Sequence, residues 1–186
     1  MTLLKPKLSK RNFARILMAL ALQTQLGSGA MASEKVLKFS QHDISIKVFS
    51  ASDVEIVYAG SPHRLSFGKV FRAKTPDDVR DFKWGTSGSY KAFAGPVDIA
   101  WRSQDGTALK YVLNLDEIFP ERKILHTEDL AKLYQAEPVY GGRPNIILEV
   151  NDRTLNVYMF VTMRLEKDAQ TREHRDHLTL AYSKTF

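Results

Sequence analysis

The sequence predicts a mainly β fold, an antiparallel β-sandwich of about eight strands with one short helix. Two observations support this prediction. Apolar and polar residues alternate with a period of two in many segments after residue 40, which is typical of strands with one buried face. Turn-forming residues separate most neighbouring strand candidates, and this favours antiparallel pairing between them.

The clearest strand signal is Asn145–Leu165, which we expect to form a hairpin with its turn at Asn151-Asp152. Its second half places apolar residues at every second position, namely Leu155, Val157, Met159, Val161 and Met163. Asn and Asp suit the turn because both tolerate positive φ and hydrogen-bond to nearby main chain. The rest of the domain is therefore expected to be organised around this hairpin.

Shorter strands are predicted elsewhere in the chain. We expect them over Val36–Phe39, Ile44–Phe49, Val54–Tyr58, Leu65–Ala73 and Leu178–Tyr182. The second of these should keep one face in solvent, since polar residues alternate with its apolar ones. Ser50–Asp53 has the composition of a turn between neighbouring strands, and Gly68 indicates a bulge.

A second hairpin is predicted over Val97–Ser103 and Leu109–Leu115, because Asp105-Gly106 between them is a strong turn signal. Its inward-facing side chains should be Val97, Ile99 and Trp101 opposite Leu109, Tyr111 and Leu113. The inner faces of these two strands are thus expected to form part of the core.

Helical signals are few. We predict a helix over Thr127–Gln135, where Thr127 suits the N-cap and Leu130, Leu133 and Tyr134 form an apolar side. Proline suits a first helical turn, so Pro76–Phe82 is a shorter candidate. The rest of Lys74–Gly95 is predicted to be a long loop, and long ordered loops in compact domains often carry function.

Residues 1–32 have the layout of a secretory signal peptide. Basic residues come first, the short apolar run Ile16–Leu22 follows, and Ala30-Met31-Ala32 is a small-x-small cleavage site. The alternative is an amphipathic helix or a membrane anchor, but the run is shorter than the ~20 residues that span a bilayer. Cleavage after Ala32 would leave a single β-rich domain, residues 33–186, in the periplasm. Ser9–Arg15 is similar to a twin-arginine signal with Lys10 at the first arginine position, so general and twin-arginine export both stay open.

The charge of the domain argues against nucleic acid as a partner. The chain of 186 residues carries 27 Lys and Arg and 21 Asp and Glu, a net charge of +6. Five basic and no acidic residues lie in residues 1–32, which leaves 22 basic and 21 acidic residues, a net charge of +1, for residues 33–186. That part contains no basic run interleaved with aromatic residues, which a nucleic-acid interface would need.

No catalytic or metal-binding set is recognisable in the sequence. The chain has no cysteine, so disulfides and thiolate metal sites are excluded. Gly85–Gly88 is one residue short of a nucleophile elbow, and Gly88–Lys91 lacks P-loop spacing. His174 and His177 lead into a predicted strand, where residues three apart point to opposite faces and do not share a metal. We therefore expect no metal, no cofactor and no enzymatic activity; an enzyme using Ser87 and His126 ranks last.

One segment resembles a known family. Trp84-Gly85, Pro96–Ser103, Asp105 and Tyr111 form a pattern similar to that of small exported envelope proteins of Gram-negative bacteria. Some members of this family are immunity proteins of type VI secretion phospholipase effectors, and many are lipoproteins. The present chain lacks the lipid-bearing cysteine, so the resemblance implies a soluble periplasmic protein without stable membrane insertion.

The function that this resemblance implies is a periplasmic immunity protein that binds and blocks a secreted antibacterial toxin. Trp and Tyr are favoured at interface hot spots, and acidic residues steer association with a basic surface. The expected partner-binding residues are Asp78, Asp81, Trp84, Tyr90, Phe93 and Tyr140. Two alternatives stay open: the aromatics pack the loop onto the sheet, or the chain is an envelope-assembly or ligand-binding module without a toxin partner. Homo-oligomerisation is undecided.

Overall fold

The computed structural model describes residues 37–166 and 172–186, and the predicted signal peptide over residues 1–32 lies outside them. The described residues form nine strands and four short helical segments. In chain order they are β1 (Gln41–Phe49), β2 (Ala51–Tyr58), β3 (Ser61–Ser66), η1 (Pro76–Lys83), β4 (Gly88–Lys91), β5 (Val97–Ser103), β6 (Ala108–Leu113), α3 (Leu115–Ile118), η2 (Leu130–Lys132), η3 (Tyr140–Gly142), β7 (Asn145–Asn151), β8 (Thr154–Glu166) and β9 (Arg172–Thr185). Among these residues, no helix is long and apolar enough to cross a membrane.

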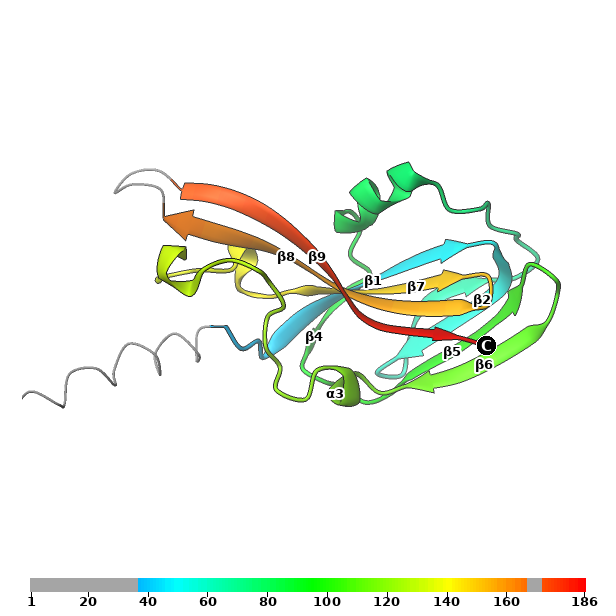
Figure 1. Cartoon of the computed structure of the whole chain (residues 1–186). Helices are drawn as coiled ribbons and strands as arrows, with labels where there is room; N and C mark the ends of the chain where they lie inside the picture. Colours follow the sequence, from blue (N-terminus) through cyan, green and yellow to red (C-terminus); the bar gives the residue numbers. More distant parts are fainter. Residues whose placement is uncertain (1–36, 167–171) are drawn as a thin grey trace, which may run out of the picture. The chain divides into compact units, whose positions relative to one another are not determined.

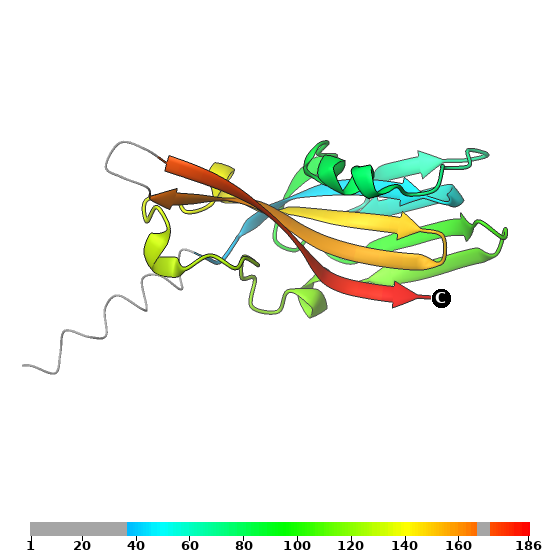
Figure 2. The ribbon, with the colours of Figure 1, turned by 45° about the horizontal axis from the view of Figure 1, so that its top comes forward.

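The strands form two sheets that pack on each other, so the predicted β-sandwich is confirmed (Figure 1 and Figure 2). One sheet has the order β4-β1-β7-β8-β9 and the other the order β3-β2-β5-β6. The core between them is built from the inward apolar positions of both sheets, among them Ile44, Val54, Ile99, Ile146 and Val157. Burial of such alternating faces is what stabilises a sandwich.

The chain passes from one sheet to the other between β1 and β2. Phe49 ends β1, Ala51 begins β2, and Ser50 between them has a φ of 48°. The predicted turn over Ser50–Asp53 is therefore wrong, since Ala51 already pairs with Ser103 and the two strands lie in different sheets. The local composition indicated that the chain changes direction here, but it did not indicate which sheet the next strand would join.

β1 lies inside its sheet, paired antiparallel with β4 and parallel with β7. This is the one parallel pair among the described strands. Parallel strands need a long connection between them, and a long stretch of chain separates β1 from β7. The prediction of a solvent-facing side for this strand is also wrong. Ser45 and Phe49 are 1% and 7% exposed, because a later segment of the chain covers the outer face of the sheet.

The central hairpin is confirmed as β7 and β8, which pair from Asn145–Phe160 to Asn151–Thr154. Its turn is Asp152-Arg153, one residue later than predicted, and Asp152 has a φ of 52°. The five apolar residues of the predicted inner face of β8 are all buried. Alternation alone was sufficient here because both strands belong to one local hairpin.

β8 extends beyond its pairing with β7, since Asn145, the first residue of β7, pairs with Phe160 and β8 continues to Glu166. Figure 2 shows β8 and β9 extending beyond the four-stranded sheet. The free edge of this extension takes Leu133 and Val139 as isolated bridge partners of Leu165 and Met163. The predicted helix over Thr127–Gln135 is wrong for this reason, and only the single turn η2 forms there. Main-chain groups at a strand edge need hydrogen-bond partners, and an extended segment supplies them where a helix does not.

Strand boundaries differ from the prediction elsewhere too: β6 ends at Leu113 instead of Leu115, β9 extends beyond Leu178–Tyr182 at both ends, and β4 forms inside the predicted loop. β3 ends at Ser66, and the following chain turns at Gly68, whose N–H donates to Asp53 Oδ1 at 2.7 Å, so the predicted strand over Leu65–Ala73 is wrong. From the predicted strand over Val36–Phe39, Lys38 forms only an isolated bridge to Lys123, and Val36 lies outside the described residues. The short helix predicted at Pro76–Phe82 is present as η1.

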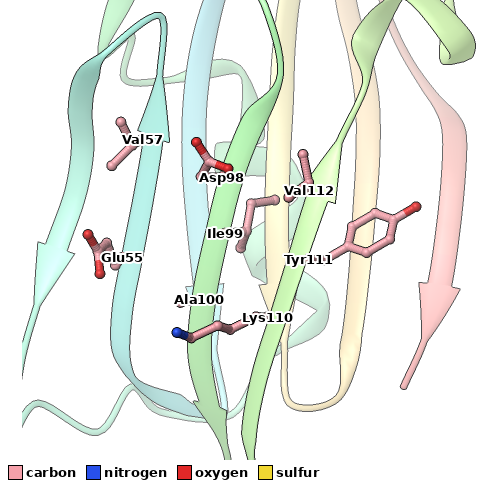
Figure 3. A pocket seen from close by; sticks show the side chains of 8 residues that line it. All are labelled: Glu55, Val57, Asp98, Ile99, Ala100, Lys110, Tyr111 and Val112. Carbon is pink, nitrogen blue, oxygen red and sulfur yellow. The ribbon is translucent and has the colours of Figure 1, made fainter.

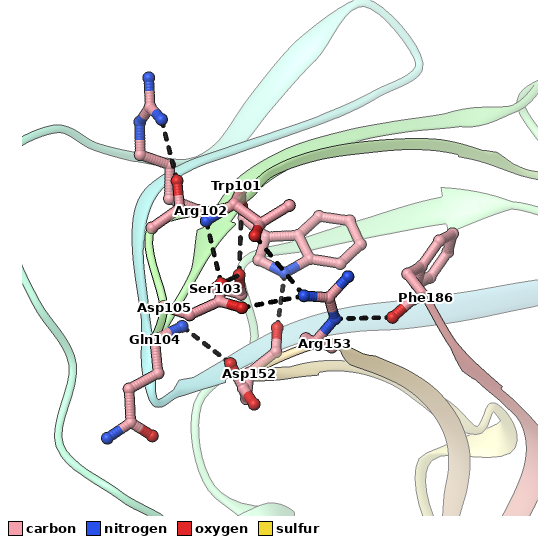
Figure 4. Close-up of polar contacts among 10 residues, drawn as sticks. Trp101, Arg102, Ser103, Gln104, Asp105, Asp152, Arg153 and Phe186 are labelled. Atoms are coloured by element: carbon pink, nitrogen blue, oxygen red, sulfur yellow. Dashed lines mark hydrogen bonds and ion pairs between the residues drawn. The ribbon is translucent and has the colours of Figure 1, made fainter.

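The hairpin of β5 and β6 has the predicted register, with Trp101 opposite Leu109. Figure 4 shows how its turn is joined to the turn of β7 and β8. Trp101 Nε1 donates to the main-chain oxygen of Asp152 at 2.6 Å, and Arg153 Nη1 lies 2.9 Å from Asp105 Oδ2. Trp101 and Asp105, two residues of the family resemblance, thus connect the two sheets at one end of the sandwich.

The two tryptophans allow a direct test of this arrangement, because Trp101 is 2% exposed and Trp84 is 65% exposed. Trp101→Ala should lower the free energy of unfolding by about 3–5 kcal/mol, since it empties a large core site. Trp84→Ala should change it by about 0.5 kcal/mol or less, as is usual for a surface site. Urea denaturation followed by circular dichroism measures both, and equal losses would contradict the assignment.

Candidate partner-binding groove

The outer face of the five-stranded sheet carries a buried charge. Glu149 on β7 is 0% exposed, and its carboxylate accepts from Lys74 Nζ at 2.5 Å and from Asn156 Nδ2 at 2.8 Å. Lys74 belongs to residues 72–87, a segment that covers part of this face and that we call the strap. Its ammonium group also lies 4.8 Å from the centroid of the Phe82 ring. A buried carboxylate needs such partners, so this ion pair holds the strap to the sheet.

The first half of the strap is ordered by Asp78. Its carboxylate accepts from the main-chain N–H and the hydroxyl of Thr75, at 2.6 and 2.7 Å, and from Arg72 Nη1 at 2.8 Å. The hydrogen bonds from Arg72 and Thr75 hold the pKa of this carboxyl well below its usual range. Asp78, which we expected to face a partner, is therefore engaged within the strap at the start of η1.

Phe82 anchors the second half of the strap. It is 1% exposed and forms a cluster on the outer face with Phe49 and Ile147. Lys47 on β1 then fixes the chain that follows, because its Nζ donates to the main-chain oxygens of Asp81 at 3.1 Å and Trp84 at 2.9 Å. The main chain at Trp84 is thus held in place, while its indole ring projects from the surface.

A second exposed aromatic ring comes from the turn η3. Tyr140 is 56% exposed, and its ring contacts the His174 ring at a centroid distance of 5.4 Å. The guanidinium carbon of Arg164 lies 4.8 Å from the centre of the same ring, and Arg164 also pairs with Glu137. Arg164 and His174, which are paired neighbours on β8 and β9, thus support the tyrosine ring at the surface of these strands.

Trp84 and Tyr140 line one groove, which we call the aromatic groove. It consists of two adjoining hollows of about 470 and 410 Å³. Both hollows are lined by Lys83, Trp84, Phe160 and Asp176, and the second also by Tyr140, Thr162 and His174. The Lys83–Asp176 ion pair crosses it with an N–O distance of 3.1 Å. The groove therefore has aromatic walls and a floor contributed by Phe160, with charged groups between them.

Three of the six expected partner-binding residues meet at this groove, since Asp81 lines the first hollow beside Trp84. The sequence analysis missed its other lining residues, which come from β8, β9 and the end of η1. A signal for Phe160 was present, because Tyr158 and Phe160 are aromatic residues on the predicted solvent-facing side of the central hairpin. Such residues indicate that something covers or uses that face.

Tyr90 and Phe93 lie elsewhere, packed against the main core. The Tyr90 hydroxyl lies 2.7 Å from His63 Nε2, and the Tyr90 ring lies 4.7 Å from that of Tyr58. Phe93 packs on the buried ring of His42 at 5.2 Å. Tyr90 and Phe93 therefore pack the loop onto the sheets, which is one of the alternatives that the sequence left open. Trp84 does not pack in this way.

The outer face of the other sheet has a shallower hollow of about 230 Å³ (Figure 3). Figure 3 shows that Glu55, Asp98 and Lys110 project from three neighbouring strands among small apolar side chains such as Val57 and Val112. Its one aromatic lining residue, Tyr111, has its hydroxyl 2.9 Å from that of Tyr182, and the charges of the hollow are of mixed sign. This face offers less to a partner than the aromatic groove does.

The histidine pair noted in the sequence does not form a joint site. His174 contacts Tyr140 on the outer face, whereas His177 Nε2 lies 3.0 Å from Glu128 Oε1. Within the described residues, no group of three His, Asp or Glu side chains is arranged to hold a metal ion. Comparison of the chain with protein-family models, curated proteins and solved structures gives no match. The family resemblance of Trp84–Leu115 thus stays a prediction.

The ion pair beneath the strap leads to a stability prediction. Glu149→Gln leaves Lys74 without its counter-charge, so it should lower the free energy of unfolding by about 3–5 kcal/mol. Asp77→Asn is the control, because the Asp77–Arg80 pair is 78% and 76% exposed, and its loss should cost about 1 kcal/mol or less. Urea denaturation measures both. Equal effects of the two substitutions would show that the strap does not depend on Glu149.

The buried His42 beside Phe93 leads to a pH prediction. Burial lowers its pKa from 6.5 to about 4, so the folded protein keeps this ring neutral at pH values where the unfolded chain protonates it. The resulting stability is fully present above pH 6.5 and is lost progressively as the pH falls to about 4. His42→Phe should fit among the neighbouring aromatic rings and flatten this part of the curve. Thermal unfolding between these pH values tests it, and an unchanged slope would exclude His42 as the cause.

Proposed function

We propose that this protein is a periplasmic immunity protein that binds a secreted antibacterial toxin of the type VI lipase or phospholipase kind and blocks its active site. The observation that carries the proposal is the aromatic groove, in which the exposed rings of Trp84 and Tyr140 line one hollow above Phe160. Trp and Tyr are among the residues most enriched at the hot spots of protein–protein interfaces.

The groove is partly preorganised for binding. Lys47 holds the main chain at Trp84, and Arg164 and His174 contact the Tyr140 ring, so a partner would not need to order that main chain or that ring. Binding then avoids part of the entropy that ordering flexible side chains costs. The ion pair between Lys83 and Asp176 supplies polar groups of both signs inside the groove.

The compartment and the toxin class rest on the sequence. The predicted signal peptide over residues 1–32 would deliver the domain to the periplasm, where a toxin of this kind acts. The resemblance of Trp84–Leu115 to immunity proteins supplies the class of partner. Trp84 belongs both to that resemblance and to the aromatic groove, which links the two arguments.

The test is co-expression of this protein, directed to the periplasm, with each lipase-like protein that the neighbouring genes encode. Cells should survive only when both are made, and the two proteins should purify together. Trp84→Ala and Tyr140→Ala should each weaken binding by about 2 kcal/mol or more, as hot-spot residues do. Phe67→Ala is the matched control, because its ring is 68% exposed but does not line the groove.

Different failures have different meanings. Equal killing with and without this protein, and no complex, would overturn the immunity function itself. Protection that survives both groove substitutions would place the interface elsewhere on the domain. Recovery of an envelope lipid or glycan from the native host, in place of a toxin, would favour a ligand-binding or envelope-assembly module.

A further inference from the structure

Trp84 also lines a further hollow, which the function proposed above does not use. It has a volume of about 280 Å³ and is lined by Lys47, His63, Arg64, Trp84, Thr86 and Ser87. These residues come from β1, from β3 and from the second half of the strap. We call this hollow the basic pocket, because no acidic side chain lines it.

Arg64 is the most informative residue of the basic pocket. Its Nε atom is inaccessible to solvent and has no hydrogen-bond partner, and no carboxylate within the described residues forms an ion pair with it. Other arginines differ, since Arg72, Arg102, Arg143 and Arg153 each lie within 3.2 Å of a carboxylate oxygen. A guanidinium group that is partly buried without a counter-charge is available to an anion.

Lys47 supplies the second charge. Its ammonium group donates two hydrogen bonds to main-chain oxygens of the strap and makes no ion pair within the described part of the chain, so one of its three protons stays unused. Burial and the nearby Arg64 lower the pKa of Lys47, although Asp81 and Asp78 act in the opposite direction. A positive charge in these surroundings would be stabilised by a bound anion.

The hydrogen bonds around His63 show that Ser87 is not prepared as a nucleophile. The Ser87 hydroxyl donates to the main-chain oxygen of Ile44 at 2.9 Å, because a carbonyl can only accept. His63 Nδ1, 3.2 Å from Ser87 Oγ, is therefore the donor of that pair, and His63 Nε2 accepts from Tyr90. With this proton arrangement His63 does not remove a proton from Ser87, so the pocket is better suited to binding than to catalysis.

We propose that the basic pocket binds the phosphate group of a phosphomonoester. A phosphomonoester carries a charge of about −1.5 to −2 and three strong acceptor oxygens. Lys47 and Arg64 provide two positive charges, the guanidinium provides a planar donor pair, and Thr86 adds a hydroxyl at the edge of the pocket. The exposed indole of Trp84 forms one wall, against which the organic part of the ligand packs.

The experiment is titration of the full chain with inorganic phosphate at constant ionic strength, by calorimetry and by the amide chemical shifts of Gly85, Thr86 and Ser87. Saturable binding at one site is expected. Arg64→Gln should weaken it about tenfold or more, as the loss of a charge-assisted hydrogen bond does. Arg102→Gln removes the same charge from a residue already paired with Asp53, and should leave phosphate binding unchanged.

Three results would overturn the proposal. They are absence of saturable binding, equal weakening by Arg64→Gln and Arg102→Gln, and acetate binding as tightly as phosphate, which would indicate a site for carboxylates. Thermal unfolding checks that Arg64→Gln is folded, and Arg64→Lys, which keeps the charge but not the planar fork, should bind with intermediate affinity.

Vesicles then identify the source of the phosphate. Binding to phosphatidylcholine vesicles that contain phosphatidic acid, but not to those with an equal amount of phosphatidylglycerol, would indicate a lipid phosphomonoester. Phosphate binding without vesicle binding would indicate a soluble one, and both results support the pocket. No toxin enters this experiment, so its outcome is independent of the immunity function.

Discussion

The ion pair between Lys74 and Glu149 is the interaction on which the surface features of this domain depend. Glu149 lies on β7, in the middle of the five-stranded sheet, and its side chain points to the outer face. A charge at that place is unfavourable unless a partner comes to it, and the partner is 75 positions away in the sequence. The strap that contains Lys74 also contains Phe82 and Trp84, and Trp84 lines both hollows of the aromatic groove. The second layer on this face is therefore built around one buried carboxylate.

A second constraint is the unequal length of the strands. β8 and β9 run beyond β7, so the last part of β8 pairs with β9 on one side and has no neighbouring strand on the other. The chain between α3 and β7 fills that edge with isolated bridges, and Tyr140 reaches the surface at the end of this stretch. Tyr140 thus lies at the groove because the edge of β8 needs hydrogen-bond partners. Trp84 lies there because the strap that contains it also supplies the counter-charge of Glu149.

Trp84 lies where these two consequences meet, because it lines both hollows of the aromatic groove and the basic pocket. Its main chain is fixed by Lys47, a residue of β1 that also lines the basic pocket. A change at Lys47 would therefore affect both surfaces, whereas Arg64 and Tyr140 each belong to one of them. The two surfaces proposed for binding therefore lie next to each other and differ in chemistry.

The sequence by itself determined the features that depend on local order. Alternation placed the inner faces of β5, β6 and β8 correctly, because side chains change face at every residue of a strand and a short turn fixes the register of a hairpin. It also singled out Trp84 and Tyr140, whose flanking glycines and polar residues indicated exposed loops. Only the tertiary structure decided that β1 and β2 enter different sheets, that Thr127–Gln135 forms a bridge to β8 in place of a full helix, and that Tyr90 and Phe93 pack inward. Only the tertiary structure showed that Lys47 and Arg64 line one pocket and that Trp84 and Phe160 line one groove. These residues are far apart in the chain, and no local sequence pattern indicates which of them come together.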